Sequence, residues 1–461
     1  MPGLGAYTGR PVGVLGLGRS GRALARALLA RGAEPVLFDD DPATLRRAVA
    51  ETGGRPGVPE EVARLALLVP SPGVPLTHPA PHPLIAAARA AGVPILGDIE
   101  LFAATHPEAR LVGVTGTNGK STTTALIAHI LTAAGLPATA AGNIGRPVFD
   151  LAPASGDILV LELSSFQLDL CRSLRCRIAV WLNLEPDHLD RHGGLEAYIA
   201  AKRRIFAGQR AEDAAVIAVD DPVSRALAAE LEATGRRVIR VSGGDEPAAV
   251  RVPEGRLREE DAEGIREVLD LSTVPSLRGV HNRQNAAAAY AAARLLGVAP
   301  ATAARALASF PGLPHRMREV GRLGRIRFVD DSKATNPAAA GRSLASFPAV
   351  YWIAGGRPKP GGFDALAPHL GNVRRAFLIG EAADELARFL DGRVPAEDVG
   401  DLARAVAAAA RAAREEEEAE PVVLLAPACA SFDQFTDFEA RGRAFAELVA
   451  GLAAPAGGGA P

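Results

Sequence analysis

Lysine is scarce in this sequence, and nearly all of the basic residues are arginine. Of 51 lysine and arginine residues, only four are lysine, at positions 120, 202, 333 and 359, so 51 − 4 = 47 are arginine. Arginine is a planar, permanently charged fork, whereas lysine is a compact charge that can lose its proton and react. A chain that uses arginine for nearly every cation is expected to keep lysine where arginine cannot replace it. The four lysines therefore indicate a functional site.

Cysteine and long apolar runs are also scarce. The three cysteines, Cys171, Cys176 and Cys429, are an odd number and contain no Cys-x-x-Cys pair, which suits a reducing cytoplasm. The sequence has no run of about 18 apolar residues and no basic start followed by an apolar stretch, so we expect neither a membrane span nor a secretory signal. The net charge of −2 gives no reason to expect nucleic acid or a membrane as a partner. We expect a cytoplasmic monomer.

The length of 461 residues is enough for about three domains of roughly 150 residues each. Apolar runs typical of buried strands alternate with Ala/Leu-rich helical stretches along the whole chain, which predicts α/β units with parallel sheets covered on both faces. We expect domains at 1–97, 98–312 and 313–461. The acidic run 414–420 is expected to be a solvated helix face, and the tail 454–461 to be disordered. The expected strands are 12–17, 35–39, 65–69, 110–115, 157–163, 178–182, 325–329, 349–354, 376–379 and 421–426, and the clearest helices are 21–31, 121–134 and 283–296.

A glycine-rich loop follows the strand predicted at 110–115. Residues 113–121 read Gly-Val-Thr-Gly-Thr-Asn-Gly-Lys-Ser, in which Gly113 lies one residue too early for the usual Walker spacing. Small residues let backbone N–H groups surround phosphate oxygens, and the following helix N-terminus adds partial positive charge. Lys120 would reach the β- and γ-phosphates, and the Ser121 hydroxyl would bind Mg²⁺. We predict ATP binding by Gly116, Thr117, Asn118, Gly119, Lys120, Ser121 and Thr122.

A second glycine-rich loop, Gly16-Leu17-Gly18-Arg19-Ser20-Gly21, follows the first predicted strand. With Asp39 about 20 residues further on, it fits a dinucleotide-binding fingerprint. The same loop would bind any pyrophosphate, so NAD is one candidate among several.

Eight motifs, taken together and in order, resemble the Mur ligases of peptidoglycan synthesis. They are TGTNGKST at 115–122, GNIG at 142–145, ELSSFQ at 162–167, DHLD at 187–190, HNRQN at 281–285, PHR at 314–316, DDSKATN at 330–336 and ACASFDQF at 428–435. The resemblance spans nearly the whole chain and is greatest to the members that add D-glutamate to UDP-N-acetylmuramoyl-L-alanine. The Asp-Asn-Pro-Arg run that marks the sibling adding the third peptide residue does not occur.

The resemblance implies a three-domain α/β enzyme with a Rossmann-like N-terminal domain, a P-loop-type central domain with a parallel sheet and a Rossmann-like C-terminal domain. The first domain would hold the UDP-sugar, the second ATP and the third D-glutamate. ATP would convert the substrate carboxylate into an acyl phosphate, which the D-glutamate amine attacks. The implied catalytic residues are Lys120, Asn143, Glu162, His188 and Lys202; further ATP contacts are His281, Asn282, Asn285, Arg316 and Asp331; UDP-substrate contacts are Gly16, Leu17, Gly18, Arg19, Ser20, Asp39, Ser71, Gly73, Ser164 and Gln167; and D-glutamate contacts are Lys333, Thr335, Ser431 and Phe438.

The resemblance also implies two Mg²⁺ ions and a carbamate formed from CO₂ on Lys202. The implied metal ligands are Ser121, Glu162, His188 and carbamylated Lys202. From the sequence pattern we expect Glu162 and His188 to end adjacent strands. Only a neutral amine attacks CO₂, so arginine would fail at position 202. The alternative for Lys202 is an exposed residue beside Arg203 and Arg204.

Several of these residues have simpler structural explanations. Asn282 and Asn285 are also typical of helix N-caps, and His188 of a helix cap or a core position. Phe438 could be core, and Ser431 a turn residue. Asp330 could replace Asp331, and Lys359 could be a further anion contact; Trp181 and Trp352 are expected in the core.

Three other functions remain open at the sequence level. The nearest is a sibling ligase or folylpolyglutamate-type synthetase that adds a different amino acid. A nicotinamide-dependent dehydrogenase is supported only by the loop 16–21. An ATP-binding regulator without catalysis is the third, and the many polar clusters at predicted strand ends argue against it.

Overall fold

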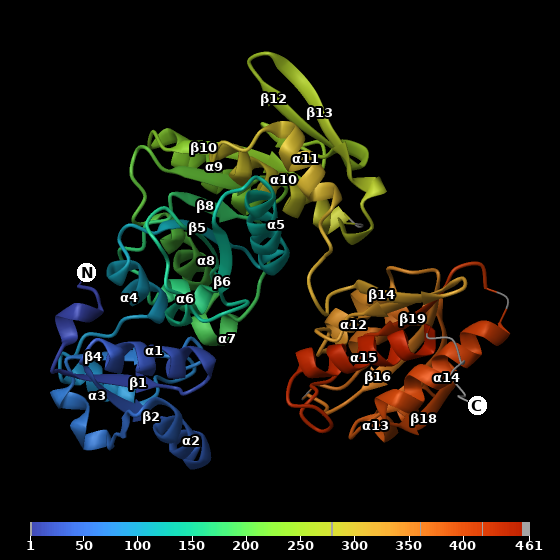
Figure 1. The fold of residues 1–461 in the computed structure, drawn as a ribbon, viewed down its shortest axis with the longest axis horizontal. Helices are drawn as coiled ribbons and strands as arrows, with labels where there is room; N and C mark the ends of the chain where they lie inside the picture. The colour runs from blue at the N-terminus through green and yellow to red at the C-terminus, as the bar shows by residue number, and fades with distance from the viewer. Residues whose placement is uncertain (1, 278–279, 360, 417, 454–461) are drawn as a thin grey trace, which may run out of the picture. The chain divides into compact units, whose positions relative to one another are not determined.

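The structure is a computed structural model that describes residues 2–277, 280–359, 361–416 and 418–453. The expected disordered tail, 454–461, lies outside the described residues. The chain divides into two compact units, Met1–Phe310 and Pro311–Pro461. The first unit contains two sheets and the second contains one (Figure 1). Among helices of the described residues, none combines the length and apolar character needed to span a bilayer.

The first sheet has four parallel strands in the order β3-β2-β1-β4. Its strands are β1 (Pro11–Leu15), β2 (Glu34–Phe38), β3 (Arg55–Pro56) and β4 (Leu67–Pro70). The accompanying helices are α1 (Arg19–Ala30), α2 (Pro42–Thr52) and α3 (Pro83–Ala90), with 3-10 turns at Leu4–Tyr7 and Pro59–Arg64. Leu24 and Leu28 of α1 pack on one face of the sheet, and Ile85 of α3 packs on the other. Helix α4 (Asp98–Thr105) then leads to the second sheet.

The second sheet has nine strands in the order β13-β12-β11-β10-β9-β8-β5-β7-β6. Pairing is parallel from β6 to β11, and β12 and β13 form an antiparallel hairpin at one edge (Figure 1). The strands are β5 (Arg110–Thr115), β6 (Ala138–Gly142), β7 (Ile158–Glu162), β8 (Ile178–Trp181), β9 (Ala214–Ala218), β10 (Arg237–Ser242), β11 (Val250–Arg251), β12 (Arg256–Asp261) and β13 (Gly264–Asp270). The helices are α5 (Lys120–Ala133), α6 (Ser165–Asp169), α7 (Leu189–His192), α8 (Leu195–Arg203), α9 (Pro222–Ala233), α10 (Val280–Leu295) and α11 (Pro300–Ala308), with 3-10 turns at Val148–Asp150, Arg204–Phe206, Pro253–Gly255, Leu271–Thr273 and Pro275–Leu277.

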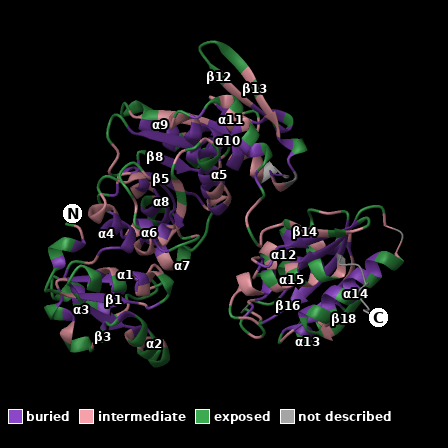
Figure 2. Ribbon diagram, viewed as in Figure 1, coloured by how far each residue is buried: buried purple, intermediate pink, exposed green. Residues whose placement is uncertain are grey.

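Two apolar cores cover the faces of the second sheet (Figure 2). Helices α5, α10 and α11 pack on one face, and α6, α8 and α9 pack on the other. In α10 the eight residues 286–293, all alanine except Tyr290, are at most 2% exposed. A helix that is buried on all sides needs small side chains to approach its neighbours closely, which explains this alanine-rich stretch.

The second unit has one six-stranded sheet in the order β14-β15-β19-β16-β17-β18, parallel except for the β14–β15 pair. Its strands are β14 (Arg318–Leu323), β15 (Ile326–Asp330), β16 (Ala349–Gly355), β17 (Val373–Ile379), β18 (Ala396–Gly400) and β19 (Pro421–Leu425). Its helices are α12 (Pro337–Leu344), α13 (Ala383–Leu390), α14 (Leu402–Glu415) and α15 (Phe438–Ala453), with a 3-10 segment at Asp364–Asn372. Helices α12 and α13 cover one face, and α14 and α15 cover the other.

The α/β prediction with mainly parallel sheets is confirmed, and every predicted strand is present within a few residues of its expected bounds. Trp181 and Trp352 are both fully buried, as expected. The sequence pattern did not predict β3, β6, β9–β14 or β18, because these strands are short, polar or rich in alanine.

The prediction for the acidic run 414–420 holds for Arg414 and Glu415, which are helical and exposed, and is wrong beyond them. Helix α14 ends at Glu415, and Glu416 already has extended backbone (φ −90°, ψ 135°). Glu416 accepts a hydrogen bond from the Tyr351 hydroxyl at 2.8 Å, and Glu418 pairs with Arg374. Glu416 and Glu418 therefore contact residues of strands β16 and β17 and do not belong to a helix face.

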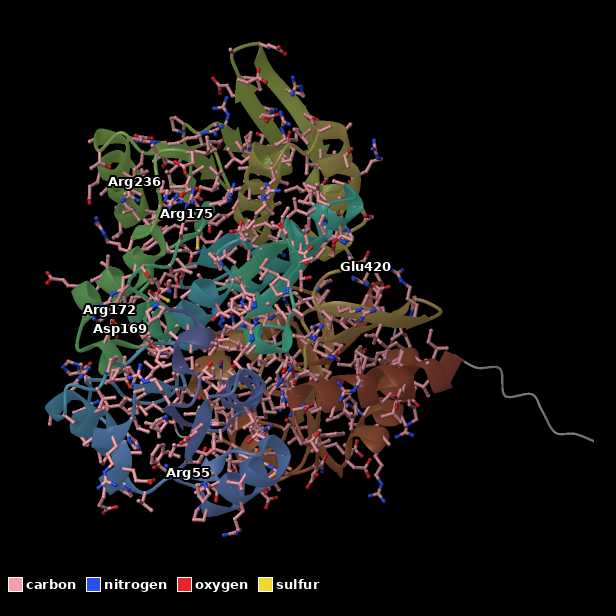
Figure 3. All side chains as sticks on the ribbon, turned by 60° about the vertical axis from the view of Figure 1, so that its left-hand side comes forward. Arg55, Asp169, Arg172, Arg175, Arg236 and Glu420 are labelled. Atoms are coloured by element: carbon pink, nitrogen blue, oxygen red, sulfur yellow. The ribbon has the colours of Figure 1, made fainter. Side chains whose placement is uncertain are left out.

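Arginine serves mainly as a surface cation, as the composition suggested. Arg55 pairs with Glu61 at 2.9 Å, and Arg175 pairs with Asp213 at 2.7 Å; both arginines are labelled in Figure 3.

Candidate functional site

The phosphate loop connects the end of β5 to the start of α5, as predicted. Gly116 and Gly119 have φ values of +150° and +84°, which other residues rarely adopt. A side chain at Gly116 would also press on Leu182 Cβ at 2.9 Å. Glycine is therefore required at both positions by the backbone conformation and at Gly116 by the packing.

Lys120 folds back over this loop. Its Nζ donates to the carbonyl oxygens of Thr117 at 2.8 Å and Gly116 at 3.1 Å. Ser121 is buried, and Thr122 is half-buried in the first turn of α5. The ammonium group and the helix N-terminus thus lie at the same loop, which is the arrangement that a polyphosphate requires.

Glu162 lies at the end of β7 and is 3% exposed. Asn143, which follows β6, donates from Nδ2 to Glu162 Oε1 at 3.0 Å. The other carboxylate oxygen, Oε2, is buried and has no hydrogen-bond partner within the described part of the chain. A buried carboxylate oxygen without a partner is costly unless a cation satisfies it, so the structure provides a position at which a metal ion would fit.

His188 does not end a strand adjacent to that of Glu162, so this expectation was wrong. Strand β5 lies between β7 and β8, and His188 precedes α7, beyond the end of β8. Its φ is +52°, its ring lies 4.9 Å from the Phe166 ring, and Nε2 is 3.4 Å from Asp187 Oδ2. Phe166 belongs to α6, four residues after Glu162, so His188 reaches this region from a loop. His188 occupies the N-cap position of α7, but its side chain makes no cap hydrogen bond. The core alternative is wrong, because the side chain is about half exposed.

Lys202 is 1% exposed, which excludes the alternative of an exposed lysine. Its Nζ donates to the Gly116 carbonyl oxygen at 2.7 Å and lies 4.7 Å above the Tyr198 ring. Burial, with a smaller contribution from the nearby Lys120 charge, lowers the pKa of Lys202 to about 7. Two of the four lysines therefore share one carbonyl oxygen of the phosphate loop.

Asn285 lies beside the same loop. Its Oδ1 accepts from the Thr123 hydroxyl at 3.2 Å, and its Nδ2 donates to Asn282 Oδ1 at 3.1 Å. A side chain at Gly119 would collide with Asn285 Oδ1. Because α10 begins at Val280, both asparagines lie inside the helix, and the N-cap alternative is wrong. The side chain of His281 lies outside what the structure describes.

The predicted UDP-substrate residues of the first sheet gather at the carboxyl ends of β1, β2 and β4. Asp39 Oδ2 accepts from the Leu17 backbone N–H at 2.7 Å, and the Ser71 hydroxyl donates to the Gly16 carbonyl at 2.7 Å. Gly18 and Ser20 flank the start of α1, where Gly18 is the N-cap. Leu17 is fully buried, so only its backbone can meet a ligand. The carboxyl edge of a parallel sheet is where ligands bind in such folds.

Two predicted UDP contacts of this sheet also make hydrogen bonds to residues of the second sheet's region. Arg19 donates to the Gly145 carbonyl at 3.0 Å, and the Gly73 carbonyl accepts from Arg191 at 2.9 Å. Ser164 and Gln167 form a capping box at the start of α6, with the Ser164 hydroxyl accepting from the Gln167 N–H. Ser164 and Gln167 therefore stabilise the start of α6, whether or not they also bind substrate.

In the second unit the predicted D-glutamate residues lie around the ends of β15 and β19. Lys333 Nζ lies 4.6 Å above the ring of Phe438, the first residue of α15. Ser431 is buried, and Thr335 and Phe438 are half-buried, so Phe438 is not a core residue. The ammonium group and the ring thus form a cation–π contact.

Asp330 and Asp331 both have partners within the second unit. Asp330 Oδ2 lies 2.6 Å from His315 Nδ1. Asp331 accepts from the Met317 N–H at 3.2 Å and from the Ser343 hydroxyl, and burial raises its pKa to about 6. Arg316 is half-buried in the loop before β14.

The sequence interpretation missed two residues that organise these loops. Arg441 is 1% exposed and donates to Ser332 O at 3.0 Å and Cys429 O at 3.2 Å, which links the loops after β15 and β19. Its burial lowers its pKa to about 10. Tyr198, buried one helical turn before Lys202, lies with its hydroxyl 3.1 Å from Thr117 Oγ1. Nothing in the local sequence distinguishes Arg441 from the other 46 of the 47 arginines. Tyr198 could have been found, because it lies four residues before Lys202 and therefore on the same face of a helix.

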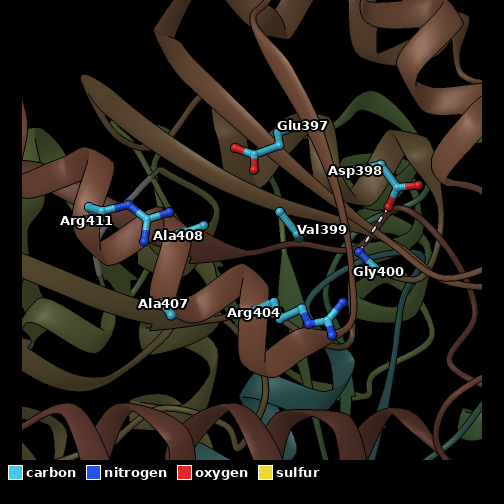
Figure 4. Close-up of a pocket in the computed structure, with 8 residues that line it drawn as sticks. All are labelled: Glu397, Asp398, Val399, Gly400, Arg404, Ala407, Ala408 and Arg411. Carbon is cyan, nitrogen blue, oxygen red and sulfur yellow. Dashed lines mark hydrogen bonds between the residues drawn. The ribbon is translucent and has the colours of Figure 1, made fainter.

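An open pocket of about 520 Å³ on the second unit contains none of the predicted site residues (Figure 4). It lies between the edge strand β18 and α14 and is lined by Glu397, Asp398, Val399, Gly400, Arg404, Ala407, Ala408 and Arg411. Within the described residues no group of three His, Cys, Asp or Glu side chains could hold a metal ion. The predicted metal set contains only two residues of these types, Glu162 and His188; its other members are Ser121 and Lys202.

Two family models match the chain. Residues 114–293 match the Mur ligase middle domain, and residues 315–429 match the domain described as "Mur ligase, glutamate ligase domain". The chain is 50% identical over 460 residues to a UDP-N-acetylmuramoylalanine–D-glutamate ligase of Caulobacter sp. (strain K31), with 98% of each sequence covered. It is 48% identical to the enzyme of the same name from Paramagnetospirillum magneticum, with 96% of each covered.

Solved structures with a similar fold include UDP-N-acetylmuramate-alanine ligase from Thermotoga maritima, with a TM-score of 0.57 at 19% identity, covering 96% of this chain and 100% of that one. MurF from Acinetobacter baumannii has a TM-score of 0.58 at 17% identity, covering 87% and 88%. At these identities the likeness concerns the fold alone.

Proposed function

The chain belongs to the Mur ligase family, and we propose that it joins D-glutamate to UDP-N-acetylmuramoyl-L-alanine with the consumption of ATP. The single observation that carries this proposal is the identity of about 50% over nearly the whole length with ligases of that name. The product is a peptidoglycan precursor. The alternative of a nicotinamide-dependent dehydrogenase rested on the loop 16–21 alone. The pyrophosphate group of a UDP-sugar accounts for that loop equally well.

The proposed reaction has two steps. The substrate carboxylate attacks the γ-phosphorus of ATP, which forms an acyl phosphate and releases ADP. The D-glutamate amine then attacks the acyl carbon, loses a proton and expels phosphate as the amide forms. Bringing two anions together in the first step requires strong positive charge, and Lys120 with the N-terminus of α5 supplies part of it.

The partnerless Glu162 Oε2 supports a Mg²⁺ site beside the loop. We assign Ser121, Glu162 and His188 as its ligands, with Asn143 holding the Glu162 carboxylate, and we expect two ions. When bound, Mg²⁺ would neutralise charge on the phosphates. Lys202 would contribute as a carbamate, which its burial and lowered pKa favour because the neutral amine is the reactive form.

We propose further contacts to each of the three substrates. Gly16–Arg19, Ser20, Asp39, Ser71 and Gly73 would hold the UDP part of the substrate, with Ser164 and Gln167 near its sugar. Lys333, Thr335, Ser431 and Phe438 would hold D-glutamate, for which a cation, hydroxyl groups and an apolar wall are suitable. Asn282 and Asn285 would lie at the adenine of ATP. Arg316 and Asp331 belong to the second unit and stay predicted ATP contacts. The three sheets would form domains at 1–97, 98–312 and 313–461.

The decisive experiment measures phosphate release by the purified protein with ATP, Mg²⁺ and UDP-N-acetylmuramoyl-L-alanine, against a panel of L- and D-amino acids. We expect turnover with D-glutamate and none above background with L-glutamate, L-alanine or L-lysine. Turnover that depends on another amino acid would identify a sibling ligase and overturn the proposal.

A further inference from the structure

A chain of three polar side chains runs beside the phosphate loop and has no role in the reaction described above. Asn183 follows β8, Asp220 follows β9 and Gln284 lies on α10. Asn183 Nδ2 donates to Gln284 Oε1 at 2.8 Å, and Gln284 Nε2 donates to Asp220 Oδ2 at 2.6 Å. We call Asn183, Gln284 and Asp220 the amide relay.

One end of the amide relay holds the backbone of the phosphate loop. The Asn183 carbonyl accepts from the Thr117 N–H at 2.9 Å, and Asn183 Oδ1 accepts from the Asn118 N–H at 2.8 Å. Asn183 Nδ2 also donates to the Asn118 carbonyl at 3.2 Å. A single asparagine therefore contacts three successive peptide groups of the loop, one through its backbone carbonyl and two through its side-chain amide.

The other end is anchored beyond β10. Asp220 Oδ1 accepts from the Ser242 hydroxyl at 2.8 Å and from the Gly243 N–H at 3.0 Å. A side chain at Gly243 would press on the Gln284 backbone nitrogen at 2.9 Å, so this turn and α10 are in close contact. The relay thus connects the loop after β5, the N-terminal part of α10 and the turn after β10.

The direction of each hydrogen bond is determined by chemistry. Asp220 can only accept, so the amide nitrogen of Gln284 faces it and the amide oxygen faces Asn183. Asn183 must then present its nitrogen to Gln284, which leaves its oxygen for the Asn118 N–H. The bond to the carboxylate is charge-assisted and is the strongest of the series.

The amide relay is not part of the apolar core. Asp220 is exposed, and Asn183 and Gln284 are half-buried. Polar contacts at the surface add little to the free energy of folding. The relay lies at the carboxyl edge of the sheet, where its contacts end on the loop proposed to bind phosphate.

We propose that Asn183, Gln284 and Asp220 are positioning residues that hold the phosphate loop in its nucleotide-binding shape and join it to α10. This inference rests on the proposed function only in that the loop binds a nucleotide. It predicts that the affinity for adenine nucleotide depends on the complementarity of the three side chains and not on any one of them touching the ligand.

The test exchanges the donor and acceptor between Gln284 and Asp220. Gln284→Glu places two carboxylates together. Asp220→Asn replaces one acceptor oxygen by an NH₂ donor, which must then face either Gln284 Nε2 or the Ser242 hydroxyl and the Gly243 N–H. The combination Asp220→Asn/Gln284→Glu restores one amide facing one carboxylate. We expect each single variant to weaken Mg·ADP binding about tenfold, and the combination to return it to within about threefold of the wild type, measured by titration calorimetry on the full-length protein. Tenfold corresponds to about 1.4 kcal/mol.

Three controls make the result specific. Gln434→Glu makes the same chemical change at an exposed glutamine of the second unit and should leave ADP binding unchanged. Gln284→Ala adds no charge and should weaken ADP binding as the single variants do. In turnover, the single variants should raise KM for ATP and leave KM for D-glutamate unchanged.

Three results would overturn the proposal. The first is single variants that bind ADP within twofold of the wild type, which together with a lower melting temperature would assign the relay to stability alone. The second is a combination that binds ADP no more tightly than the single variant with the lower affinity. The third is an equal rise in KM for all substrates. Failure of the ligase proposal is read separately, from the absence of D-glutamate-dependent phosphate release in the wild type.

Discussion

At the scale of single residues, the scarcity of lysine was informative. Lys120 and Lys202 come from different helices, yet both ammonium groups donate to the carbonyl oxygen of Gly116. Lys333 lies over an aromatic ring in the second unit. Lys359 is exposed, and its role as an anion contact stays a prediction. Guanidinium groups are larger and permanently charged, so arginine could not replace a buried lysine that must become neutral.

Lys202 carries a prediction at this scale. With a pKa of about 7 in place of 10.5, about half of its amine is neutral at pH 7, compared with about one part in 3,000 for an ordinary lysine. The neutral fraction, and with it the capacity to form a carbamate, rises as the pH increases through 7. We expect Lys202→Ala to lose at least about 100-fold in turnover and to be partly restored by acetate or formate.

Phosphate-release assays with and without added carboxylate would check this expectation. Lys202→Arg is the matched control, because its charged side chain still fills the space and no carboxylate should restore it. Near-normal turnover in either variant would remove the carbamate from the proposal.

At the scale of elements, the loop and helix at 116–133 were predicted from the sequence, but their packing was not. Gly119 precedes α5 and Gly135 follows it, with φ values of +84° and +77°. A side chain at Gly119 would collide with Asn285, whereas the space around Gly135 is open. Substitutions at these two glycines therefore distinguish the effect of a strained backbone, which both would have, from the effect of a collision with Asn285, which only Gly119 would have.

We expect Gly119→Ala to abolish detectable Mg·ADP binding, because the loop must move away from Asn285. Gly135→Ala bears a similar backbone penalty of about 1 kcal/mol and should lower the melting temperature by only a few degrees with ADP binding intact. Calorimetric titration and thermal melting of both variants would check this. Equal losses of ADP binding would show that the contact with Asn285 is unimportant.

At the scale of the whole molecule, the chain divides between Phe310 and Pro311. All residues of the two cores of the second unit lie within that unit. A domain with its own sheet and cores on both faces is expected to fold alone.

We therefore expect residues 311–461, expressed separately, to unfold in one cooperative transition with the far-ultraviolet circular dichroism of an α/β protein. Thermal melting and dispersion of amide signals in a heteronuclear NMR spectrum would check it. A fragment that lacks a cooperative transition would mean that this unit depends on the rest of the chain.

Local patterns were sufficient for the alternation of strands and helices, the position of the phosphate loop and the buried tryptophans, because hydrophobic periodicity and glycine spacing report on neighbouring residues. Strands β10–β14 and β18 were missed because they are largely polar and partly exposed, and β3 because it has only two residues. Strands β6 and β9 were missed because alanine-rich runs read equally well as helices. The adjacency of β7 and β8 was predicted wrongly, because the sequence order of strands does not reveal that β5 pairs with both.

From its sequence alone, this protein could be assigned to an α/β class, to the use of a polyphosphate and, by resemblance, to a ligase family. The folded chain alone decided that Lys202 is buried, that Glu162 keeps one oxygen without a partner, that Arg441 links two loops and that Asn183 reaches Gln284. Those facts depend on contacts between residues up to about a hundred positions apart. Burial and hydrogen-bond partners are properties of such distant contacts, and no local pattern contains them.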